Sequence, residues 1–287
     1  MKSLVERLST LLILGRVSNL PTVWSNLLAG WFLAGGGNDC AALALLLPGG
    51  SFLYVGGMYL NDFCDADFDS QYCPERPIPA GKISRRAVGG MAGLWFAVGI
   101  VCLAPFGWLT AGIALLLLVL IVLYDFRHKN VSWAPLVMGG CRFLLYLMSA
   151  SAVRIQIPWH VFVLGAILGL YVAGITYVAR GESRPDKPAR WALLLLLLPV
   201  VLPFLICITW LRSVADLPVL LSSLLLLLWM AWLFVPLWRK TNRSIGRVVS
   251  GLLAGVVLVD MIAVGSMTLF FLFFALALLL QRVIPAT

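Results

Sequence analysis

The sequence contains very little charge, and its acidic residues are especially few. Only 11% of the 287 residues are charged, and 12 acidic residues stand against 21 basic ones, which gives a net charge of +9. Hydrophobic residues make up 62% of the chain, and the mean hydropathy is +1.00. This composition is too apolar for a soluble domain of this length and predicts a multi-pass membrane protein.

Histidine and cysteine are also scarce, which removes several classes of site. The two histidines, His128 and His160, are too far apart in the sequence to suggest a histidine-based metal site. The six cysteines are scattered without a C-x-x-C pair, so neither a disulfide framework nor a zinc site is predicted. There is no P-loop and no recognisable nucleophilic Ser or Cys arrangement. The first residues, MKSLVERLST, do not resemble a cleavable signal peptide.

The apolar runs predict an all-α polytopic bundle of about nine transmembrane helices, with residues 1–287 forming a single domain. Helices are expected at about 16–35, 41–61, 87–103, 109–124, 134–152, 159–178, 191–210, 217–238 and 248–281. The last run is too long for one straight span. Gly265 and Ser266 leave open whether it forms one helix with an extension or a ninth and a tenth helix.

Basic residues occur in short clusters between these runs, as in proteins that orient in a membrane rather than bind nucleic acid. The N-terminal tail, every second loop and the C-terminal end carry all the Lys and Arg residues except Arg142, Arg154 and Arg212. The positive-inside rule therefore predicts a multi-pass protein of the cell membrane. Its N-terminus and its acidic loops are expected to face the cytoplasm.

The densest group of acidic residues lies at the end of the second apolar run, in NDFCDADFDSQYCPERPIPAGK (61–82). On a continuous helix, Asn61, Asp65 and Asp69 lie on one face with Asp62 nearby, and Asp67 points elsewhere. Converging carboxylates at a membrane surface repel one another, which a bound cation would relieve. Oxygen ligands without His or Cys favour Mg²⁺. A solvated, charged helix end is the alternative interpretation.

The pattern N-D-x-x-D-x-x-x-D followed by R-P-I-P-A-G-K resembles the first aspartate-rich motif of the UbiA superfamily of intramembrane prenyltransferases. The matching residues are Asn61, Asp62, Asp65, Asp69, Arg76, Pro77, Gly81 and Lys82. The segments RVSNLPTVW (16–24) and YVARGE (177–182) are similar to a divergent EboC-like branch, which is associated with small-molecule export. The resemblance implies a helical bundle around a central cavity.

Superfamily members carry a second acidic motif after the sixth helix, where this chain has Glu182 and Asp186. The spacing matches, but Arg180 and Arg184 flank these acids, and Pro185 disfavours a helical Arg184. Two interpretations remain open. One is a weakened second metal site in which the arginines share the neutralisation of phosphate, and the other is a salt-bridged structural loop.

The resemblance implies a Mg²⁺-dependent transfer of an isoprenoid group from a prenyl diphosphate to a small, aromatic or lipophilic acceptor within the lipid bilayer. It assigns catalytic roles to Asp65, Asp69 and Arg142. The implied metal ligands are Asn61, Asp62, Asp65, Asp69, Glu182 and Asp186. The implied substrate-binding residues are Asn19, Asn61, Arg76, Lys82, Lys129 and Arg180.

Three alternatives stay open at this point. The protein could keep the fold without turnover and bind, or help export, a small isoprenoid or aromatic molecule. Asn19 and Asn26 could line a cavity near the diphosphate or make a hydrogen bond between helices. The intramembrane Asp260 could pair with Arg142 or help bind the acceptor.

Overall fold

The computed structural model describes residues 4–127, 131–180, 192–201, 217–238 and 245–284, and every regular element in these ranges is helical. The labelled elements are α1 (Leu4–Leu14), η1 (Val17–Asn19), α2 (Leu20–Leu33), α3 (Cys40–Tyr72), α4 (Arg85–Leu103), η2 (Ala104–Phe106), α5 (Trp108–Arg127), α6 (Ala134–Val153), α7 (Trp159–Arg180), α9 (Leu217–Trp238), α10 (Ile245–Val264) and α11 (Thr268–Gln281). Within these ranges, seven helices are long and apolar enough to cross a membrane.

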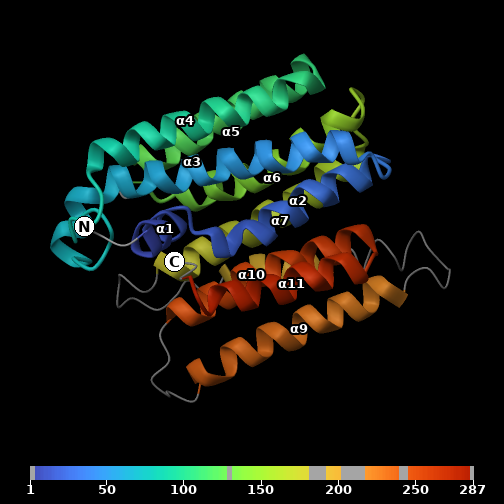
Figure 1. The fold of residues 1–287 in the computed structure, drawn as a ribbon. Coiled ribbons are helices and arrows are strands. Elements are labelled where there is room, and N and C mark those ends of the chain that lie inside the picture. Colours follow the sequence, from blue (N-terminus) through green and yellow to red (C-terminus); the bar gives the residue numbers. More distant parts are fainter. Residues whose placement is uncertain (1–3, 128–130, 181–191, 202–216, 239–244, 285–287) are drawn as a thin grey trace.

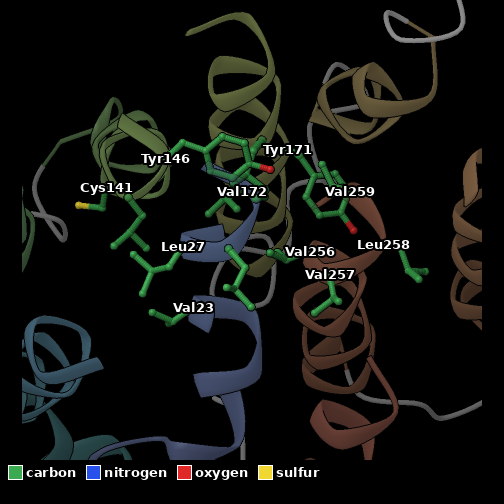
Figure 2. Close-up of a cluster of buried hydrophobic side chains, with 14 of the residues drawn as sticks. Val23, Leu27, Cys141, Tyr146, Tyr171, Val172, Val256, Val257, Leu258 and Val259 are labelled. Carbon is green, nitrogen blue, oxygen red and sulfur yellow. The ribbon is translucent and has the colours of Figure 1, made fainter. Parts of the chain in front are cut away.

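The long helices run side by side in one bundle (Figure 1). Helices α3 to α6 form one part of it and α9 to α11 another, and α2 and α7 lie between them. The core where α2, α6, α7 and α10 meet is filled by apolar and tyrosine side chains (Figure 2). Many large apolar side chains on the outer helices are exposed, as expected for surfaces that face lipid.

The start of the chain differs from the helix expected at 16–35. A separate helix, α1, ends at Leu14, and the membrane helix α2 begins only at Leu20. The change of direction falls at Arg16, which adopts a left-handed conformation with a φ of +42°. Pro21, in the first turn of α2, favours a helix start there because its missing N–H needs no partner at that position.

The structure shows where the helices of the second and the last apolar runs begin and end. Helix α3 continues through the acidic segment and ends at Tyr72, just before Pro74. Its start is capped by Asp39, which accepts a hydrogen bond from the Ala42 N–H at 3.0 Å. The last run forms a pair, α10 and α11, and the break falls at Gly265, whose φ of +68° suits glycine.

Candidate functional site

The uninterrupted course of α3 places the acidic motif on one buried face. Asn61, Asp62, Asp65 and Asp69 are all buried, with 3 to 8% of their surface exposed. In contrast, the Asp67 side chain is 83% exposed and pairs with Arg85 at 3.1 Å. The helical spacing predicted this division, because 3.6 residues per turn bring positions four apart to the same side.

Two arginines from outside α3 converge on this face. The Arg76 Nη1 lies 2.9 Å from the Asp69 Oδ2 and 3.7 Å from the Asp62 Oδ1. The Arg16 Nη2 lies 3.6 Å from the same Asp62 oxygen and donates a 3.2 Å hydrogen bond to the Asn61 Oδ1. Burial alone would lower the pKa of Arg76, but the two carboxylates outweigh it and hold the pKa above its ordinary value. Arg76 therefore remains a cation beside the acidic face.

Arg16 was not among the predicted site residues. It is the described non-glycine residue with a positive φ, a conformation that costs about 1–2 kcal/mol for an L-residue. Its carbonyl oxygen accepts a 3.3 Å hydrogen bond from the Tyr54 hydroxyl, which helps to hold the turn. The signal in the sequence was its position at the membrane edge of the first apolar run. The left-handed turn that directs it to α3 was not visible there.

Asp125 is a second site residue that the sequence did not reveal. It lies in the last turn of α5, and its Oδ1 accepts a 3.1 Å hydrogen bond from the Asn61 Nδ2. The side chain is buried. The surrounding sequence, YDFRHKN, has the composition of a basic loop, so it gave no reason to expect an acidic site residue there. Only the packing of α5 beside α3 brings it to the acidic motif.

A cavity lies between α3, α5 and α6 and reaches Asp125 and Arg142. Most of its wall is apolar, with a few polar groups. The lining residues are Tyr54, Gly57, Met58, Leu117, Ile121, Tyr124, Asp125, Met138, Cys141, Arg142 and Leu145. Because Asp125 also contacts Asn61, the cavity adjoins the acidic face of α3.

The interior polar residues form a different group. Arg142 is buried and donates hydrogen bonds to Asn26 and Thr22, not to the motif carboxylates. Asp260 makes no ion pair with Arg142 within the described residues, because Asn26 lies between them and bonds to both. Asn26 therefore makes a hydrogen bond between helices, which is one of the two roles expected for it. The same side chain also binds Arg142, which lines the cavity.

The remaining predicted residues are distributed more widely. Asn19 is buried at the end of η1, and Lys82 is exposed in the loop after α3. Arg180 ends α7 and donates a 3.0 Å hydrogen bond to the Val131 carbonyl. Lys129, Glu182 and Asp186 lie outside the described residues, so the structure leaves the second acidic motif as a prediction.

The donor set at the α3 face suits a hard cation that is completed by other oxygen ligands. The Asp62 Oδ1 is buried and accepts no hydrogen bond, although both arginines lie within 4 Å. Among the described side chains, no three His, Cys, Asp or Glu residues are placed to hold a metal alone. Mg²⁺ ordinarily takes one or two protein carboxylates together with water and substrate phosphates, which fits this arrangement.

Known proteins are similar to this chain in sequence and in fold. Residues 20–251 match the UbiA prenyltransferase family. A 4-hydroxybenzoate octaprenyltransferase of Photobacterium profundum is 31% identical over 43% of this chain and 44% of its own length. A digeranylgeranylglyceryl phosphate synthase of Sulfolobus acidocaldarius is 35% identical over 45% of this chain and 43% of its own. The chain thus matches about half the length of these curated relatives.

Solved structures of UbiA homologs show the same fold over nearly the whole chain. A homolog from Archaeoglobus fulgidus bound to GPP and Mg²⁺ superimposes with a TM-score of 0.68 at 13% identity, covering 96% of this chain and 99% of its own. A homolog from Aeropyrum pernix gives a TM-score of 0.66 at 16% identity, covering 86% and 96%. With the family match and the acidic motif in place, this chain belongs to the UbiA prenyltransferase family.

Proposed function

We propose that the protein transfers an isoprenoid group from a prenyl diphosphate to a small aromatic or lipophilic acceptor inside the membrane. The observation that carries this proposal is the buried acidic face of α3, with two arginines beside it and an apolar cavity next to it. Prenyl diphosphates have the matching chemistry, because a highly charged group is joined to a water-avoiding tail.

The diphosphate would bind at the acidic face. Asn61, Asp62, Asp65 and Asp69 would hold Mg²⁺, which supplies Lewis-acid stabilisation of the phosphate oxygens when bound. Arg76 and Arg16 already lie at this face and would share the negative charge of the leaving diphosphate. The arginines compensate the carboxylates in the structure and would turn toward phosphate when substrate arrives.

The isoprenoid tail would occupy the cavity. Breaking its C–O bond to diphosphate leaves an allylic cation, and the acceptor forms a new bond to this carbon and loses a proton. Apolar walls such as Leu117 and Ile121 keep water from the cation, and the Tyr54 ring offers a π face to it. Tyr146 and Tyr171 do not line this cavity, and their hydroxyls donate hydrogen bonds to Asp260 and to the Leu252 carbonyl in the core.

The relatives do not share one acceptor class, since one is named as a 4-hydroxybenzoate octaprenyltransferase and the other as a digeranylgeranylglyceryl phosphate synthase. An aromatic acceptor is consistent with the Tyr54 and Tyr124 rings on the cavity wall. We also propose that the protein lies in the cell membrane with the acidic face toward the cytoplasm, as the basic loops indicate.

Membranes containing the protein should release diphosphate from farnesyl or geranylgeranyl diphosphate when Mg²⁺ is present. Chelation with EDTA is expected to stop the release, and added Mg²⁺ is expected to restore it, because the acidic face needs the ion to bind diphosphate. Membranes without the protein are the control. Isoprenoid binding without any release would contradict transfer and favour the non-catalytic role in binding or export.

Arg76→Gln is expected to raise the KM for the prenyl diphosphate roughly tenfold or more, because a charge-assisted contact to phosphate is lost. Arg85→Gln is a matched control, since Arg85 pairs with the exposed Asp67 on the opposite side of α3. Initial rates across substrate concentrations measure both variants. Equal KM values for the two variants would show that Arg76 does not bind the substrate.

A further inference from the structure

A chain of buried polar contacts joins α10 to the cavity through the interior of the bundle. Asp260 on α10 accepts hydrogen bonds from Ser25, from Tyr146 and, at 2.7 Å, from the Asn26 Nδ2. The Asn26 Oδ1 accepts a 2.8 Å hydrogen bond from the Arg142 Nη1. Asp260, Asn26 and Arg142 therefore form a relay, and its last member lies on the cavity wall.

Some N–H groups of Arg142 donate no hydrogen bond within the described residues. A guanidinium carries five N–H groups. One bonds to Asn26, and two more reach the carbonyl oxygen and the hydroxyl of Thr22 at 3.3 and 3.2 Å. The other two have no hydrogen-bond partner in the described ranges, and none of the ion pairs found there includes Arg142. A cation with free donors thus borders the cavity.

Holding helices together does not require this arrangement. Elsewhere in the bundle, neutral contacts connect neighbouring helices, as between Thr110 and Ser151, or between Tyr171 and the Leu252 carbonyl. A buried cation and a buried carboxylate are far more costly inside a membrane bundle than such pairs. The cation of this relay, Arg142, lies on the cavity wall, which points to a ligand that brings an anionic group to it.

We propose that Arg142 binds an anionic oxygen group of the molecule that occupies the cavity, with Asn26 and Asp260 as positioning residues. The relay fixes one edge of the guanidinium, and the Tyr54 ring lies 5.9 Å from its central carbon. The remaining donors would form a fork that fits a carboxylate or two phosphate oxygens. This inference deepens the proposed function. The anion belongs either to an acidic group of the acceptor or to the donor's diphosphate.

Binding to the purified full chain in lipid nanodiscs tests this assignment without any turnover. The probes are benzoate, its neutral analogue benzamide, and pyrophosphate with Mg²⁺. Arg142→Gln removes the charge, and Asn26→Leu removes the bridge of the relay. If Asn26→Leu does not fold, Tyr146→Phe replaces it, because that change removes only a hydroxyl that holds Asp260. Tyr171→Phe is the matched control, since it removes a hydroxyl bond to α10 outside the relay.

Arg142→Gln and the relay variant are expected to weaken the binding of one anion roughly tenfold or more, while benzamide binding stays unchanged. Weaker benzoate binding assigns the site to an acceptor acid, and weaker pyrophosphate binding assigns it to the donor. Unchanged anion affinity in either variant, or an equal loss for all three probes, overturns the proposal. Because no turnover is measured, this result is independent of whether diphosphate release is found.

Discussion

Asp65→Asn is expected to lower Mg²⁺-dependent diphosphate release by roughly 100- to 1,000-fold, the range seen when a charge-stabilising group of an active site is removed. Asp65 lies in the middle of the buried face of α3, one turn from both Asn61 and Asp69. An amide keeps the size of the side chain but removes the negative charge that a hard cation requires. The rate of diphosphate release from a labelled prenyl diphosphate measures the effect.

Asp67→Asn gives the matched comparison on the same helix. This side chain is exposed and pairs with Arg85, and exposed ion pairs contribute little, so release should stay within about twofold of the parent protein. Whether both variants fold is checked by whether they purify as monodisperse protein in detergent. If Asp67→Asn is as harmful as Asp65→Asn, the acidic face described here is not the diphosphate site.

Gly139→Ala is expected to destabilise the bundle by about 3 kcal/mol or more, because an added methyl group would overlap the backbone of α7. A Cβ at position 139 would lie 2.2 Å from the Gly169 carbonyl oxygen. The contact is mutual, since a Cβ at Gly169 would meet the Gly139 oxygen at 2.8 Å. Small residues allow this close approach of two membrane helices. An added methyl group would meet backbone atoms, so no side-chain rotation could relieve the overlap.

Gly112→Ala and Gly93→Ala are the controls for this change. Both glycines lie inside helices, and a Cβ at either position would have no neighbour within 4 Å. Alanine favours a helix over glycine, so these variants should be as stable as the parent protein or slightly more stable. Thermal unfolding in detergent compares the three. If the Gly139→Ala protein unfolds at the same temperature as the controls, α6 and α7 are not packed this closely.

Much of the fold was accessible from the sequence because the membrane imposes a simple rule. Backbone groups in lipid must be satisfied within each segment, so long apolar runs such as those of α5 and α7 form helices. Helical spacing also placed Asp62, Asp65 and Asp69 on one face and Asp67 on another, since that division depends only on residues of a single helix. These predictions required no knowledge of how helices pack.

The partners of that face were decided by tertiary structure. Arg16 reaches Asn61 and Asp62 through a left-handed turn, and Asp125 reaches Asn61 because α5 packs beside α3. Neither contact has a fixed spacing in the sequence, so neither could be read from it. Asp125 lies in a segment with the composition of a basic loop, and Arg16 lies at the edge of an apolar run, so neither stood out in the sequence.

The same contrast holds in the interior. The sequence by itself determined that Arg142 and Asp260 are charged residues inside apolar runs and that such residues need partners. It did not determine that Asn26 stands between them, because three helices far apart in the chain must meet to form the relay. Local patterns specify which residues share a face of one helix. Only the packing of helices decides which faces meet, because that depends on side-chain shape across the whole bundle.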